Sequence, residues 1–221
     1  MAKKLDVIGT LEQGFRMVID EPRFMLFFLV PVIMLLGVFA LFGVTFFYSF
    51  GAAGATPALL DDPLMGLYMS AYLIALSLVA LVCMAGCIIK ADASLKGKKM
   101  PVAEAFLGGI RAFPRLLVSL IIVSVIGGLG FIALLIPGIY LMVRLMLAMP
   151  ACVLEGKGLG IKSSWEISKG NWWRLFALTI IIALISSLLS FLIPVVGMVI
   201  SYLFVSPASA ICYAIAYRKL K

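Results

Sequence analysis

The sequence has 221 residues and a formal net charge of +8; 64% of its residues are hydrophobic, 13% are charged, and the mean hydropathy is +1.21. A soluble domain is typically ~45–50% apolar and ~25% charged, so this composition excludes an ordinary soluble fold. Histidine is absent, and with it the commonest general base and metal ligand. We therefore expect no catalytic, cofactor or metal site, and predict that the chain is not an enzyme.

The apolar residues fall into six runs, each long enough or nearly long enough to cross a bilayer, which requires ~20 residues. The runs cover residues 24–50, 64–89, 116–136, 139–154, 175–193 and 195–217. Short connections join the members of each successive pair, at 51–63, 137–138 and 194. The sequence predicts an all-α, polytopic membrane protein with about six transmembrane helices in one domain, residues 1–221.

Basic residues alternate with these short connections along the chain. Every Lys and Arg except Arg144 lies in the N-terminal segment, in two internal basic loops, at the adjoining span ends or in the C-terminal tail. The three short connections contain none. The positive-inside rule then predicts a multi-pass protein of the inner (cytoplasmic) membrane with both termini in the cytoplasm. Because this bias accounts for the positive charge, we predict no nucleic-acid partner.

The basic segments repeat one pattern three times, over residues 5–90, 100–155 and 158–218. An amphipathic stretch comes first, then a helix breaker or span entrance, then an Arg and an apolar hairpin. The stripes at helical spacing are Ile8, Leu11, Phe15 and Val18; Val102, Phe106, Ile110 and Phe113; and Ile161, Trp165 and Trp172. Such stripes are typical of helices that lie in the membrane interface. The alternative is that each is a surface helix packed on the bundle.

Each repeat places an arginine at the entrance to its hairpin: Arg23, Arg115 and Arg174. A guanidinium there can reach lipid phosphate through its planar fork, which makes these residues candidate lipid or anion contacts. Ordinary topology anchoring is the alternative. The tryptophans of the third repeat, Trp165, Trp172 and Trp173, are candidate interfacial anchors of an aromatic belt.

Arg144 is the one basic residue inside a predicted span. An arginine at such depth is unfavourable unless it is paired, hydrated or reaches the interface. We favour a structural clamp between helices, with hydrogen bonds fixed by the guanidinium. The alternative is a functional contact with a lipid phosphate or an anionic solute.

Small residues recur every four positions in the last span, in the series Ser206, Ala210, Ala214 and Ala208, Cys212, Ala216. Small residues at this spacing permit close helix approach. The partner is either another helix of the same chain or a second copy in a homo-oligomer. The other cysteines, Cys83, Cys87 and Cys152, also lie in apolar runs and are interpreted as packing residues.

Three stretches, 137–144 (PGIYLMVR), 149–155 (MPACVLE) and 163–173 (SSWEISKGNWW), resemble a group of uncharacterised prokaryotic six-span proteins. That group is similar to the membrane domain attached to some glycerophosphodiester phosphodiesterases. The resemblance covers mainly residues 100–190 and implies a helical membrane domain. It does not imply phosphodiesterase chemistry, because the catalytic domain of those enzymes has no counterpart here.

These observations predict a non-enzymatic integral membrane protein that acts through lipid contact or membrane assembly, with anionic membrane lipids as partners. The alternative is a transporter or channel for a small or amphiphilic substrate. That alternative requires a polar path through the spans, and only Arg144, the tyrosines and scattered serines offer one.

Overall fold

The computed structural model describes residues 4–51, 63–156 and 158–221, and within them it contains helices and no strand. The all-α prediction is confirmed. The elements are α1 (Val7–Asp20), η1 (Pro22–Phe24), α2 (Leu26–Gly51), α3 (Pro63–Leu95), α4 (Val102–Ala133), α5 (Leu135–Leu145), α6 (Ala148–Glu155), α7 (Ile161–Ile167), α8 (Trp172–Leu192), α9 (Pro194–Ile200), the π-helical turn η2 (Ser201–Val205) and α10 (Ser206–Leu220).

Five segments of the described chain are long and apolar enough to cross a membrane. They are Gly66–Leu95, Val102–Ile132, Leu135–Glu155, Trp172–Leu192 and Val195–Leu220. In each of them fewer than half of the residues are buried inside the protein, so most of the apolar surface needs lipid around it. This is the architecture of a multi-pass membrane protein. The remaining predicted span corresponds to α2, of which the structure describes a shorter apolar helix, Leu26–Ala40.

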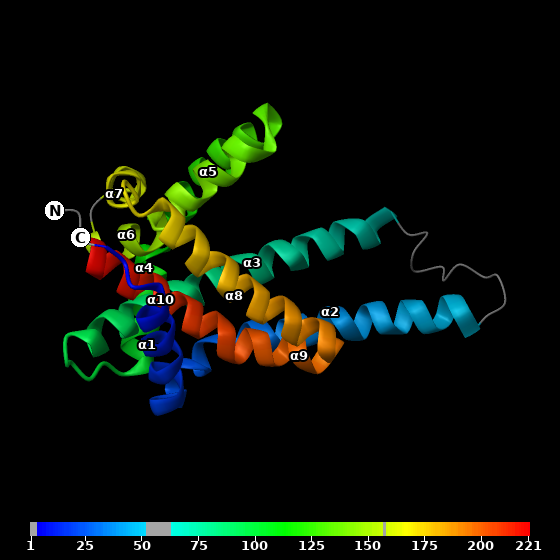
Figure 1. Cartoon of the computed structure of the whole chain (residues 1–221). Coiled ribbons are helices and arrows are strands. Elements are labelled where there is room, and N and C mark those ends of the chain that lie inside the picture. Colours follow the sequence, from blue (N-terminus) through cyan, green and yellow to red (C-terminus); the bar gives the residue numbers. More distant parts are fainter. Residues whose placement is uncertain (1–3, 52–62, 157) are drawn as a thin grey trace.

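The hairpins all start from one end of the molecule, which carries both chain termini. Figure 1 shows α1, α7 and the α3–α4 loop at this end, and the turn between α8 and α9 at the opposite end. We call it the terminal end. The connection 52–62 and Lys157 lie outside the described residues. The arrangement matches the alternation of basic segments and short connections in the sequence.

Two prolines that we expected to break helices act differently. Pro114 lies inside α4, which continues for 32 residues, although an interior proline removes one backbone hydrogen bond. The second amphipathic stretch is therefore the first part of α4 and not a separate helix. The predicted turn at Pro137 is displaced: the backbone becomes extended at Leu134, and Pro137 sits in the first turn of α5, where a missing N–H costs little.

The first amphipathic stripe packs on the bundle more than it faces outward. Val18 is fully buried, and the Phe15 ring lies 5.8 Å from that of Phe204. Ile8 remains exposed on the outside. For α1, this geometry favours the packed surface helix over a helix that presents its whole apolar face to lipid.

The small residues of α10 are covered inside the chain. Ala208, Ala210, Cys212, Ala214 and Ala216 have no exposed surface, and α10 packs against α1 and α3. Cys83, Cys87 and Cys152 are also buried and reduced. These buried members of the two small-residue series therefore mediate packing within the chain, and a homo-oligomer stays a prediction.

Candidate functional site

A groove of about 840 Å³ runs along α7, which crosses the terminal end beside α4, α5 and α6. We call it the α7 groove. Ile126 of α4 and Leu145 of α5 form its apolar wall, and Trp165, Lys162 and Lys169 line its other side. Cationic, aromatic and aliphatic groups thus meet in one hollow, which is the lining that an amphiphile with a negative headgroup requires.

Glu155 lies at one side of this groove and is already engaged. Its carboxylate accepts hydrogen bonds from Ser163 Oγ at 2.9 Å, Tyr217 Oη at 2.6 Å and Lys221 Nζ at 3.0 Å. These bonds tie α6, α7 and the C-terminus of the chain together. Glu155 is therefore a structural junction, and its charge is offset by Lys221.

The two groove lysines have no such partner. Lys162 and Lys169 are exposed, and no carboxylate of a described residue lies within 4 Å of either ammonium group. Glu166, also exposed, is the one acidic residue in the lining besides Glu155. The unpaired cations leave the groove free to receive a negatively charged group from outside.

Arg144 lies within the candidate span Leu135–Glu155 and contacts Trp165, which lines the α7 groove. The Cζ atom of its guanidinium is 5.0 Å from the Tyr140 ring centroid and 4.5 Å from that of Trp165. Its backbone carbonyl accepts a hydrogen bond from Ser164 Oγ at 2.6 Å, which fixes α5 to α7. Its Nε atom is buried and has no hydrogen-bond partner among the described residues. Among the described residues the Arg144 guanidinium thus contacts two rings and makes none of the expected hydrogen bonds, and its role as a clamp stays a prediction.

Two of the three span-entrance arginines bind backbone carbonyls of the chain itself. Arg115 donates to the carbonyl of Gly156, the C-cap of α6. Arg174 donates to the carbonyl of Leu5 at 2.6 Å. Arg23, in η1, is exposed. This geometry supports an anchoring role for Arg115 and Arg174, and the structure does not bring the three arginines together.

Two of the three predicted tryptophan anchors, Trp172 and Trp173, belong to one aromatic cluster. The Trp172 ring stacks on Phe176 at 5.1 Å, meets Trp173 edge-on at 4.7 Å and donates from Nε1 to the Tyr140 carbonyl at 3.2 Å. Trp173 is 74% exposed, whereas Trp172 is half-buried. Trp165 contacts Arg144 instead of this cluster, so the exposed Trp173 fits the expected interfacial anchor best.

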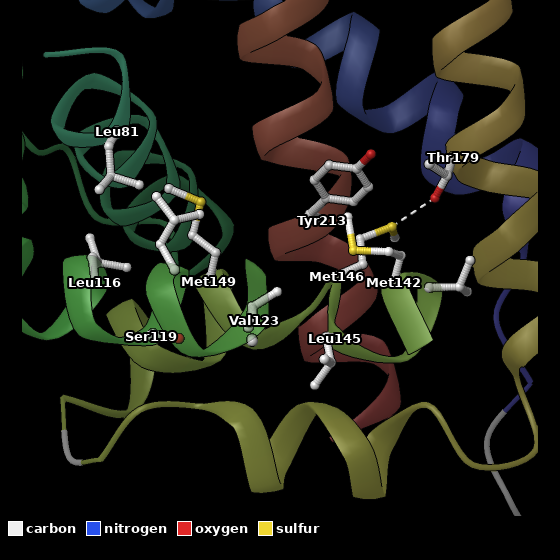
Figure 2. A pocket seen from close by; sticks show the side chains of 13 residues that line it. Leu81, Leu116, Ser119, Val123, Met142, Leu145, Met146, Met149, Thr179 and Tyr213 are labelled. Atoms are coloured by element: carbon white, nitrogen blue, oxygen red, sulfur yellow. Dashed lines mark hydrogen bonds between the residues drawn. The ribbon is translucent and has the colours of Figure 1, made fainter. Parts of the chain in front are cut away.

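A second cavity, of about 290 Å³, lies between α3, α4, α5, α6, α8 and α10 (Figure 2). We call it the methionine cavity, because Met142, Met146 and Met149 line it together with leucine and valine side chains. Leu145 lines both this cavity and the α7 groove. No spacing in the sequence indicated this cavity, because its lining comes from six elements far apart along the chain.

The methionine cavity has three hydroxyl groups in its lining, those of Ser119, Thr179 and Tyr213, and the first two are hydrogen-bonded within the protein. Ser119 Oγ donates to the Leu159 carbonyl at 2.8 Å, and Thr179 Oγ1 contacts Met146 Sδ at 2.7 Å and the Leu175 carbonyl at 2.9 Å. Arg144 is not part of the lining. The cavity therefore offers apolar surface and no polar path.

The sequence also gave no sign of a contact that fixes the N-terminal segment. Asn171 Oδ1 accepts a hydrogen bond from the Leu5 amide at 3.2 Å, while Arg174 binds the Leu5 carbonyl. The Leu5 side chain is 1% exposed. The segment before α1 is thus held against the start of α8, next to the aromatic cluster.

Comparison of the chain with protein-family models, curated proteins and solved structures gives no match. The resemblance to the membrane domain of glycerophosphodiester phosphodiesterases therefore stays a prediction. Across the described residues, no three metal-ligating side chains gather in one place. What the site can do chemically must be inferred from its own geometry.

The ring contacts of Arg144 give a direct prediction. We expect a double-mutant cycle of Arg144→Met with Trp165→Leu to yield a coupling energy of about 0.5–2 kcal/mol in the free energy of unfolding, the range of a cation–π contact. Chemical unfolding in detergent measures it. The same cycle with Trp173→Leu serves as the control, because Trp173 does not contact Arg144, and should be additive. Additive effects in both cycles would contradict the assignment.

Proposed function

We propose that this chain is a non-enzymatic integral membrane protein that acts by binding anionic lipids at its terminal end. The observation that carries the proposal is the α7 groove, in which the unpaired Lys162 and Lys169 face the same hollow as the apolar Ile126 and Leu145. An anionic lipid matches this lining, because its charged headgroup lies beside apolar acyl chains. Trp165 suits the boundary between them.

The placement of the groove supports this proposal. Its lining joins Ile126 and Leu145, which lie within two candidate membrane spans, to the polar residues of α7. Each basic residue near an anionic membrane surface contributes ~1 kcal/mol to the attraction. The transporter alternative lacks a comparable observation, because the methionine cavity is apolar and Arg144 does not line it.

The test compares lipids that differ in headgroup charge alone. We expect the full chain to bind phosphatidylglycerol more tightly than phosphatidylcholine with the same acyl chains, measured by native mass spectrometry. Lys162→Gln with Lys169→Gln should remove about 2 kcal/mol of that preference, at ~1 kcal/mol per basic residue. The control is Lys98→Gln with Lys99→Gln, which removes the same charge from exposed positions in the α3–α4 loop.

An equal preference in the groove variant and in the wild type would refute the α7 groove as the binding site. If both double variants lost the preference for phosphatidylglycerol to the same extent, overall charge, and not the groove, would attract the lipid. No preference in the wild type would refute the proposal altogether.

We further propose that the terminal end faces the cytoplasm, as the distribution of basic residues predicts. Cysteines introduced at Lys98, Lys162 and Lys221 should react with a membrane-impermeant thiol reagent only from inside. Cysteines at Ile136 and Val195, both exposed near the hairpin turns, should react from outside. The four native cysteines are buried and serve as a silent background. Labelling at Lys98 from outside would refute this topology.

A further inference from the structure

We infer that the methionine cavity is a binding site for one acyl chain of a membrane lipid. The inference rests on the proposed function and specifies where the apolar part of the ligand goes. The cavity and the α7 groove share Leu145, and Figure 2 shows this residue between the cavity and α7. A lipid whose headgroup occupies the groove therefore has an apolar hollow directly beside it.

The chemistry of the lining selects an apolar occupant. Of the three hydroxyls in the lining, those of Ser119 and Thr179 are already hydrogen-bonded within the protein, and the third belongs to Tyr213. A guest with several polar groups would therefore bury most of them without partners. Apolar cavities of comparable size stay dry and accept apolar guests. The three methionines provide flexible, polarizable walls that adapt to a chain of variable shape.

The cavity also opens toward the lipid phase. Leu120 of α4 and Met142 of α5 both line it and are 46% and 45% exposed, respectively. Nearer the hairpin turn the two helices close up: a Cβ on Gly130 would lie 3.0 Å from the Gly138 Cα atom. The exposed part of the lining thus lies below a closed hairpin tip, within segments long enough to cross a membrane.

The size of the cavity favours an acyl chain over an α-helix of a partner protein as the occupant. About 290 Å³ is at the lower limit of small-molecule pockets, which begin at roughly 300 Å³. An α-helix with side chains is ~10–12 Å across and would not fit. A single flexible hydrocarbon chain suits the small volume, the apolar walls and the partly exposed lining of the cavity.

The experiment uses the full chain in detergent and three probes: lysophosphatidylglycerol, lysophosphatidylcholine and glycerol 1-phosphate, which has no acyl chain. Native mass spectrometry should show one lysolipid per chain. Val123→Trp, which fills the cavity from α4, should weaken lysolipid binding at least tenfold. Val125→Trp adds the same ring at a position on α4 that is 56% exposed and outside the lining, and should bind like the wild type.

The outcomes separate the two proposals. If both lysolipids bind equally well and Val123→Trp weakens both, the cavity site stands and the anionic preference of the proposed function falls. If lysophosphatidylglycerol is preferred but Val123→Trp binds it as the wild type does, the proposed function stands and the cavity site falls. Glycerol 1-phosphate that binds as tightly as lysophosphatidylglycerol also overturns the cavity site, because the acyl chain then contributes nothing to binding.

A measurement without substitution covers the case in which Val123→Trp does not fold. A phosphatidylglycerol with a photoreactive diazirine midway along one acyl chain is bound to the wild type and irradiated. We expect cross-linked peptides from α5, α6 and the turn between them, which carry Met142, Met149 and Met146. Cross-links confined to the exposed hairpin tips, such as Ile132 and Phe191, would overturn the inference.

Discussion

Glu21→Gln is expected to lower the free energy of unfolding by about 3 kcal/mol. Its carboxylate Oε1 lies 2.6 Å from Lys90 Nζ, and the Lys90 side chain is 2% exposed. The ammonium also stands 4.1 Å from the centre of the Phe24 ring. Removing one partner of a buried ion pair typically costs ~3–5 kcal/mol, because the other charge stays buried without compensation. We expect the lower value because the Glu21 side chain is 41% exposed.

Two further variants separate this cause from a general effect of charge removal. Glu12→Gln removes a carboxylate from an exposed position on α1 that forms no ion pair with a described residue, and should change stability by less than about 0.5 kcal/mol. Adding Lys90→Met to Glu21→Gln should restore most of the loss, since an apolar side chain replaces the unpaired ammonium. Chemical unfolding in detergent measures all three. A double variant less stable than Glu21→Gln would contradict the explanation.

Gly109→Ala is expected to destabilise the protein by up to about 3 kcal/mol. A Cβ at this position would lie 2.7 Å from the Val82 carbonyl oxygen and 3.0 Å from the Gly86 amide nitrogen. Both are backbone atoms of α3, so the overlap forces the two helices apart. Inserting atoms into a packed contact costs ~1–3 kcal/mol, and we expect the upper part of this range because neither neighbour is a flexible side chain.

The matched control is Gly128→Ala on the same helix, where an added Cβ has no neighbour within 4 Å. Alanine is favoured over glycine in a helix by roughly 0.5–1 kcal/mol, so this variant should be as stable as the wild type or more stable. Thermal unfolding in detergent should show a lower midpoint for Gly109→Ala and an equal or higher midpoint for Gly128→Ala. Destabilisation by both variants to the same extent would indicate that the α3–α4 contact is not the cause.

The two predictions both concern contacts of α3. Lys90 and Glu21 fix the entrance of the first hairpin to α3, and Gly109 lets α4 approach that same helix. The α7 groove and the methionine cavity both have walls on α4. Loss of either contact should therefore weaken lipid binding as well as stability, by displacing those walls.

The prolines show where local chemistry sets the start of a helix and where packing overrides it. Pro22 and Pro194 each begin a helical element, as their fixed φ and missing N–H favour. Pro114 has the same local chemistry, yet α4 continues through it. The difference lies in the environment: α4 is held along its length by α3 and α5, and such packing outweighs the roughly 3 kcal/mol cost of an interior proline.

The partners of the charged residues could not be predicted from sequence. Arg115 and Arg174 occupy equivalent places in the repeat, but they bind Gly156 and Leu5, 41 and 169 positions away. Arg144 meets Trp165 only because α7 folds back beside the end of α5. Each contact depends on where a distant segment ends in space, and no local pattern carries that information.

The sequence by itself determined the helical class, the apolar segments and the grouping of basic residues at one end. These follow from the preference of each side chain for water or hydrocarbon and from the length needed to cross a bilayer, which are local properties. The tertiary structure alone decided that the small residues of α10 face α1 and α3, that Arg144 lies between two rings, and that Leu145 joins a cationic groove to an apolar cavity. These features arise where several helices cross, and the crossing points depend on packing between residues far apart in the chain.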